Sequence, residues 1–159
     1  MTRYAWNLPA AAALTLFVFV DVAQAGEPLS LDTSLNLARA AIDICQAKGF
    51  AASASVVDAQ GVVKVTLRAD GQIKPPVAAP KKAATAVAFD QAGSEMEPRE
   101  KTDPTFAATL AAHPDIYNDH PGSLPLHKDG VLVGGLAVAD VPHDVADACA
   151  REAAAKIAL

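Results

Sequence analysis

Several sequence signatures that commonly indicate a function are missing from this chain of 159 residues. It contains no Gly-x-Gly-x-x-Gly fingerprint of a dinucleotide site, no Gly-x-Ser-x-Gly motif of a nucleophilic serine and no Cys-x-x-Cys pair. Aromatic residues are also scarce, at 5% of the chain, so we expect a core of small and branched aliphatic side chains. The length suffices for one domain with a substantial core, but not for two ordinary domains.

Clustered positive charge is lacking as well. The formal net charge is −5, and Lys81-Lys82 is the only pair of adjacent basic residues. Because phosphate contacts need clustered Lys and Arg, nucleic acid and anionic membrane surfaces are disfavoured as partners. Beyond the N-terminal region, no apolar run is long and continuous enough for a membrane helix, which needs about 20 residues.

The N-terminal region has the pattern of an export signal. Arg3 precedes an apolar run from Ala10 to Val20, and Ala23-Gln24-Ala25 matches an A-x-A cleavage site. We therefore predict a signal peptide at 1–25 and a mature domain at 26–159, located in the periplasm or secreted. An uncleaved membrane anchor is the alternative, although Asp21 near the end of the apolar run argues against it.

The two cysteines, Cys45 and Cys149, both lie in the predicted mature chain. Each falls on a predicted helix, one near each end of the domain. An even number of cysteines in an exported protein favours a disulfide, which here would close a loop of roughly 100 residues. Two buried free thiols that behave as small hydrophobic side chains are the alternative.

A β-hairpin between Leu124 and Ala139 is the clearest structural prediction. Asp129-Gly130 separates two apolar runs, which is the strongest short-range signal for a tight hairpin turn. The returning run, Val131 to Ala139, is almost entirely apolar, so we expect both faces of this strand to be covered. Gly134-Gly135 in its middle indicates a bulge or a close approach by a helix or ligand.

The remaining chain predicts helices that flank this hairpin and a second one. The predicted order is helix, two strands, two helices, two strands and helix, with a charged loop at 94–103 and a polar loop at 113–125. This order predicts an α+β fold with a single central antiparallel sheet and helices on its faces, a profilin-like α/β/α arrangement. The predicted helices cover 30–48, 80–89, 104–112 and 144–158, and the first two strands cover 52–58 and 62–69.

Residue types that bind metals gather in and after the loop at 113–125. Imidazole, phenolate and carboxylate groups ligate iron, copper and zinc, and His and Tyr are both axial ligands of haem. A solvated loop whose polar residues only cap and turn the chain is the alternative. His143, which precedes a predicted helix, is interpreted as a capping residue. The acidic run of Glu95, Glu97 and Glu100 is interpreted as solvated surface, and weak binding of iron or calcium is the alternative. The candidate ligands are His113, Tyr117, His120 and His127, with Asp115 and Asp119 among them.

Several motifs, in this order and spacing, resemble the GlcG/HbpS-like haem-binding family, which also forms the C-terminal domain of PduO-type proteins. Lys82-Ala83-Ala84-Thr85-Ala86 resembles the family's K-A-x-T-A helix. The segment from Pro121 to Leu126, followed by 129–134, resembles its Pro-Gly-Gly-x-Pro and D-G-x-x-V-G hairpin. The segments 29–41 and 144–150 resemble its first and last helices.

The resemblance implies a helix–sheet–helix domain that assembles into dimers or larger homo-oligomers, with haem as a cofactor in some members and no nucleotide. It implies cofactor contacts from Lys82 and Thr85 on the K-A-x-T-A helix. His113 and His120, taken from the residue types of the polar loop, are the candidate axial ligands of haem iron. The chain departs from the family pattern at 137–140, where Ala-Val-Ala-Asp replaces Gly-Val-Ser-Gly, and in the proline-rich segment at 75–80.

Three functional hypotheses follow. The first is an exported haem-binding or haem-handling protein without catalytic turnover of its own. The second is an accessory factor or enzyme acting on a small organic acid or a cofactor fragment. The third is an oligomeric partner of a periplasmic sensor or redox enzyme. In each case we expect no nucleic-acid partner and no stable membrane insertion after signal cleavage.

Overall fold

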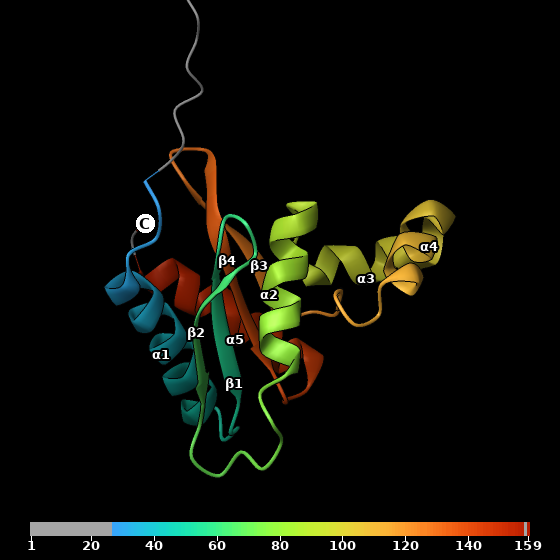
Figure 1. Cartoon of the computed structure of the whole chain (residues 1–159). Helices are drawn as coiled ribbons and strands as arrows, with labels where there is room; N and C mark the ends of the chain where they lie inside the picture. Colours follow the sequence, from blue (N-terminus) through green and yellow to red (C-terminus); the bar gives the residue numbers. More distant parts are fainter. Residues whose placement is uncertain (1–26, 158) are drawn as a thin grey trace, which may run out of the picture.

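A computed structural model describes residues 27–157 and 159 of the chain. In this part of the chain one four-stranded sheet is packed between helices (Figure 1), which confirms the predicted α+β fold. The predicted signal peptide lies outside the described residues. The elements are α1 (Leu31–Ala47), β1 (Ser53–Asp58), β2 (Val63–Arg68), α2 (Ala78–Phe89), α3 (Gly93–Thr102), α4 (Pro104–Ala112), β3 (Ser123–Lys128), β4 (Val131–Ala139) and α5 (His143–Lys156).

The sheet is built from two hairpins that lie side by side in the order β2-β1-β4-β3. All three strand pairs are antiparallel, and β1 pairs with β4 from Ser53 opposite Ala139 to Asp58 opposite Gly134. The two most buried strands, β1 and β4, are therefore central, and the less buried strands β2 and β3 form the edges. This order leaves the C-terminal end of β4 next to the N-terminal end of β1, where both strands are buried.

The β3–β4 hairpin has the tight turn that its sequence predicts. Asp129 and Gly130 have φ angles of 52° and 79°, the positive values that a two-residue primed turn requires. From Val133 to Ala139 every residue of β4 is buried. The expectation that both faces of this strand are covered is thus confirmed.

Helices cover the two faces of the sheet unequally. α1 and α5 pack on one face and form the larger core, with Leu37, Val56 and Leu136 fully buried. α2 packs on the other face, where Ala83 and Val87 meet Val57 and Ala137 in a smaller cluster. The aliphatic, Ala-rich composition makes this close packing of helix on sheet feasible.

The close approach of α2 explains one glycine of the Gly134-Gly135 pair. A Cβ atom added at Gly135 would lie 2.7 Å from the carbonyl oxygen of Ala83 and 2.9 Å from Cγ2 of Val87. Both atoms belong to α2, and the first belongs to its backbone. The sequence indicated a bulge or a close approach by a helix or a ligand at this position, and the group that approaches Gly135 is a helix.

The prediction of a charged loop at 94–103 is wrong, because this segment forms α3. Met96 is fully buried and packs with Ala86 of α2 and with Phe106 and Leu110 of α4. The helix carries only this one large apolar anchor and contains Pro98, so it lacks the apolar periodicity from which a helix is inferred. Three helices, rather than two, therefore connect the hairpins.

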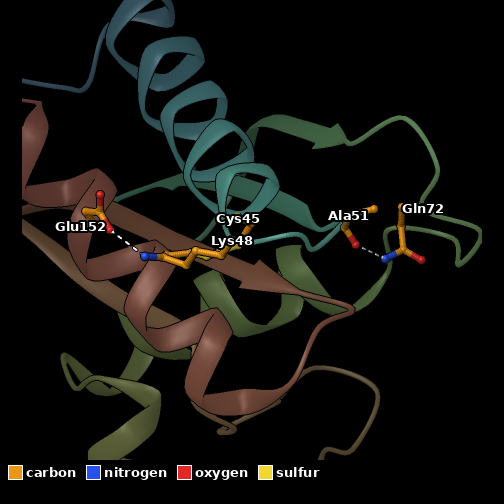
Figure 2. Close-up of a disulfide and its surroundings, with 6 residues drawn as sticks. Cys45, Lys48, Ala51, Gln72 and Glu152 are labelled. Atoms are coloured by element: carbon orange, nitrogen blue, oxygen red, sulfur yellow. Dashed lines mark hydrogen bonds and ion pairs between the residues drawn. A yellow bond between two sulfur atoms is a disulfide. The ribbon is translucent and has the colours of Figure 1, made fainter.

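Cys45 and Cys149 form a disulfide that joins α1 to α5, with a Cα–Cα distance of 5.6 Å and a sequence separation of 104. Of the two alternatives left open by the sequence, the bridge is the one observed. Nearby, the Lys48 ammonium lies 3.2 Å from a Glu152 carboxylate oxygen (Figure 2). None of the helices within the described ranges is both long and apolar enough to cross a membrane.

Candidate functional site

A cavity of about 460 Å³ lies where α2 and α5 begin, at the end of the sheet where β4 finishes. Its walls come from Lys74, Ala78 and Lys82, from the loop residues Asn118 and His120, and from the β4–α5 connection at 139–143. The cavity therefore collects basic, imidazole and apolar groups. A second hollow, of about 360 Å³ between α1 and α5, is lined by Lys48, Glu152 and neighbouring residues and contains no histidine.

Lys82 is a buried cation at this cavity. Its residue is 4% exposed, and its Nζ donates a hydrogen bond of 2.8 Å to the carbonyl oxygen of Pro121. Burial lowers the pKa of Lys82 from 10.5 to about 8, because the charged form is desolvated. The negative charges of Asp140, Glu97, Asp119 and Asp147 oppose this shift.

Three of these carboxylates are incompletely satisfied. Among the described residues, Asp119 Oδ2, Asp140 Oδ2 and Asp147 Oδ1 are buried oxygens without a hydrogen-bond partner. Asp140 also has a φ of 69°, in the left-handed region that Asp adopts more readily than most residues. This end of the sheet is thus a polar, negatively charged region with Lys82 as its buried cation.

Thr85 lies behind the cavity wall rather than in it. Its hydroxyl donates to the carbonyl oxygen of Lys81 at 2.7 Å and accepts from the backbone N–H of Asn118 at 2.8 Å. Thr85 is fully buried, and Asn118 lines the cavity. Thr85 therefore contributes to the site by fixing the loop that carries Asn118 and His120 against α2.

His120 lies at the cavity beside two residues that the sequence suggests have other roles: His143, which also lines the cavity, and Glu97. Its Nδ1 is 3.5 Å from Oε1 of Glu97, and Nδ1 of His143 is 3.7 Å from the same oxygen. The imidazole rings of His120 and His143 lie 4.8 Å apart, with an angle of 31° between their planes. His143 is the first residue of α5, consistent with the predicted capping region, but its ring also lines the cavity.

Glu97 and His143 were missed as site residues because their proximity is tertiary. Glu97 belongs to α3, which the sequence did not predict, and 46 positions (143 minus 97) separate it from His143. Two local signals point to them: the acidic run that contains Glu97, for which weak iron or calcium binding is an alternative, and the place of His143 between the end of the apolar strand and the start of a helix.

The other predicted ligands lie outside the set of residues that lines this cavity. His113 follows α4 and is exposed, with its ring 6.0 Å from that of Tyr117. Tyr117 packs on Phe89, with ring centroids 5.0 Å apart, at the edge of the cluster under α3 and α4. His127 pairs with Asp90, with 3.0 Å between Nε2 and Oδ1. The structure thus brings Lys82 and His120 together and separates them from His113, Tyr117 and His127.

The sheet and its covering helices define a small α+β domain, and the cavity at the end of β4 is a polar, ligand-sized site that contains histidines. A sequence model of the family described as "Haem degrading protein HbpS-like" matches residues 29–155. The chain belongs to this HbpS-like family. None of the curated protein sequences searched matches the chain.

Solved structures share the fold along most of the chain. A double mutant of HbpS from Streptomyces reticuli is 30% identical, with 94% of this chain and 100% of that chain covered and a TM-score of 0.75. PduOC, solved as a complex with haem, is 29% identical, with 82% and 96% covered and a TM-score of 0.73. The protein ORFY of Klebsiella pneumoniae, at 18% identity, 87% and 96% coverage and a TM-score of 0.76, shows the same fold.

Proposed function

We propose that this protein is an exported haem-binding or haem-handling protein whose ligand occupies the cavity between α2, the 118–120 loop and the start of α5. The family supports a haem-related role, and PduOC, which is 29% identical, has been crystallised with haem. The observation that carries the proposal is the pair of imidazoles and the buried ammonium of Lys82 at one cavity.

The residues present at the cavity fit the chemistry of haem. Imidazole is a common axial ligand of haem iron, and His120 and His143 both line the cavity. The ammonium groups of Lys74 and Lys82 suit the carboxylates of the haem propionates, because ion pairs of this kind are strong when partly buried. A volume of about 460 Å³ is within the usual range for pockets that hold small organic ligands. Bound haem would supply an iron centre for redox and oxygen chemistry.

One of the two histidines, rather than both, would ligate the iron. Their rings are neighbours, 4.8 Å apart and only 31° from parallel, so a haem group would be held through one of these rings. The side chains are about half exposed, at 47% for His120 and 48% for His143, so either ring is accessible from solvent. Lys82, which α2 and Pro121 hold in place, would then orient the edge of the haem that carries the propionate carboxylates.

Titration of the purified protein with haemin, followed by absorbance, tests the proposal. We expect a Soret shift for the wild-type protein at micromolar concentration, and loss of this shift in H120A or H143A. K82M should weaken binding by about tenfold or more, since a hydrogen bond to a charged group contributes about 1.5–3 kcal/mol. H127A and H113A are matched controls, because these histidines lie outside the cavity lining.

Two results would contradict the cavity assignment. No Soret shift in the wild-type protein would remove the haem hypothesis. A shift that survives in both H120A and H143A but disappears in H113A or H127A would place the ligand elsewhere.

We also propose export to the periplasm or beyond, without catalytic turnover in the protein itself. The Cys45–Cys149 bridge supports export, because such bonds persist mainly in oxidising compartments. N-terminal sequencing of protein recovered from the periplasm should begin at Gly26. Recovery from the cytoplasm with residues 1–25 still attached would contradict the export proposal.

Self-association is the last part of the proposal. Val63 at the start of the edge strand β2 and Val62 just before it are 48% and 61% exposed, and Leu31 on α1 is 58% exposed. An oligomer would cover such apolar side chains. Light scattering after size exclusion should give a mass that is a multiple of the chain mass, and a monomer would contradict this expectation.

A further inference from the structure

We infer that Glu97, His120 and His143 form a binding site for one divalent transition-metal ion, of the zinc or ferrous class, at the rim of the cavity. Among the described residues, these three form a group whose ligating atoms all lie within 4.8 Å of one another. They come from α3, from the loop before β3 and from α5, so the group is assembled by the tertiary fold. The inference does not depend on haem binding.

The distances are close to those of a coordinated metal. Zinc–nitrogen and zinc–oxygen bonds of about 2.0–2.2 Å in a tetrahedral site place neighbouring ligand atoms about 3.3–3.6 Å apart. The two Nδ1 atoms lie 3.5 and 3.7 Å from Oε1 of Glu97. A shift of a few tenths of an ångström would bring each imidazole nitrogen to coordination spacing from the carboxylate oxygen. The ligand atoms of the two histidines lie within 4.8 Å of one another, and these partly exposed rings would converge on the ion.

The backbone under these side chains is fixed by close contacts. A Cβ atom added at Gly93, where α3 begins, would lie 2.2 Å from the carbonyl oxygen of His120. Nη2 of Arg151 on α5 donates a hydrogen bond of 2.8 Å to the hydroxyl of Ser94 on α3. The three elements that carry the ligands are therefore held against one another before any metal binds, which reduces the entropy lost on coordination.

The set of ligands indicates the class of metal and the type of site. Two imidazoles and one carboxylate are typical of zinc and of non-haem iron(II), whereas calcium and magnesium prefer all-oxygen sites. Three protein ligands leave at least one coordination position free. Both histidines line the cavity of about 460 Å³, so this position would be accessible to water or to a small ligand in the cavity, as in metal sites that react or exchange.

Metal binding is tested with tag-free protein that has been stripped with a chelator. Cobalt(II) titration gives a visible spectrum of the site, and competition with zinc(II) gives the affinity. We expect one Zn²⁺ per chain, and a loss of affinity of at least about tenfold in E97Q and in H143N, because even changes to residues around the ligands cost 10- to 100-fold. E95Q, an exposed glutamate on the same helix, and H127N are matched controls with unchanged affinity.

The variants separate this inference from the haem proposal. E97Q should lose Zn²⁺ and keep the haemin titration, whereas K82M should lose haemin affinity and keep Zn²⁺. Zn²⁺ binding without any haemin binding would support the metal site and refute the haem proposal. Absence of stoichiometric Zn²⁺ binding in the wild-type protein, or equal affinity in wild type, E97Q and H143N, would overturn the inference whatever the haemin result. Far-ultraviolet circular dichroism of each variant confirms that it is folded.

Discussion

Replacing Lys82 by methionine should change how the stability of the protein depends on pH. Lys82 is 4% exposed, and its Nζ has one hydrogen-bond acceptor, the carbonyl oxygen of Pro121. Burial lowers its pKa to about 8 in the folded protein, whereas the unfolded chain has the ordinary value of 10.5. Methionine has a similar length and no charge, so the variant removes this difference between the two states.

The sign and size of the effect follow from proton linkage. Between pH 8 and pH 10.5 the unfolded state keeps the Lys82 proton while the folded state releases it, so the free energy of unfolding rises with pH. The gap between the two pKa values corresponds to about 3 kcal/mol, since one pKa unit is about 1.4 kcal/mol. This penalty on the folded state is fully present below pH 8 and is relieved above that value.

Urea unfolding of the wild-type protein and of K82M at a series of pH values from 7 to 10.5 measures this effect. The difference in unfolding free energy between the two proteins should move in favour of the wild type by about 3 kcal/mol over this range. Other titrating groups are common to both proteins and cancel in the difference, and the bridged cysteines do not titrate. A difference that stays constant within about 0.5 kcal/mol would refute the claim that Lys82 is desolvated in the folded state.

Three further predictions concern stability. The double variant C45A/C149A should lose about 4–5 kcal/mol in urea unfolding, since the bridge closes a loop of roughly 100 residues; a loss below about 1 kcal/mol would mean that the bridge hardly restricts the unfolded chain. G135A should cost about 1–3 kcal/mol, because its methyl group would displace the backbone of α2 at Ala83, and unchanged stability would contradict the close approach. M96A should cost about 2–5 kcal/mol and expose α3 to limited proteolysis, and retained protease resistance would show that α3 has another anchor.

How much of the fold the sequence predicts depends on how local each signal is. The β3–β4 hairpin was predictable because Asp129-Gly130 sets the turn and the apolar run of β4 sets its burial. α3 was not predictable in the same way, since Met96 is its one large buried side chain and its charged residues read as a loop. The pairing of Cys45 with Cys149 stayed open because nothing in the sequence itself shows that α1 and α5 are neighbours.

The residues of the candidate site also differ in how local their sequence signals are. Lys82, Thr85 and His120 were singled out beforehand, the first two through a family motif and the third through the local density of polar residues. The sequence alone favours solvated surface for Glu97, with weak iron or calcium binding as the alternative, and a helix cap for His143. Their proximity to His120 arises only when α3, the loop and α5 pack together. His113, Tyr117 and His127 were close to His120 in sequence, yet the chain directs them to other neighbours.

The disulfide has a mechanical consequence. Every strand of the sheet and every residue that lines the cavity lies between Cys45 and Cys149 in the sequence. The bridge therefore closes the chain from Cys45 to Cys149 into a covalent ring. A tension applied to the two chain ends would pass through the sulfur–sulfur bond, and the polypeptide between the two cysteines would carry none of it. Pulling could then unravel only the segments outside the ring, which include most of α1 and the second half of α5, and the cavity lining would carry no load until the bond is reduced.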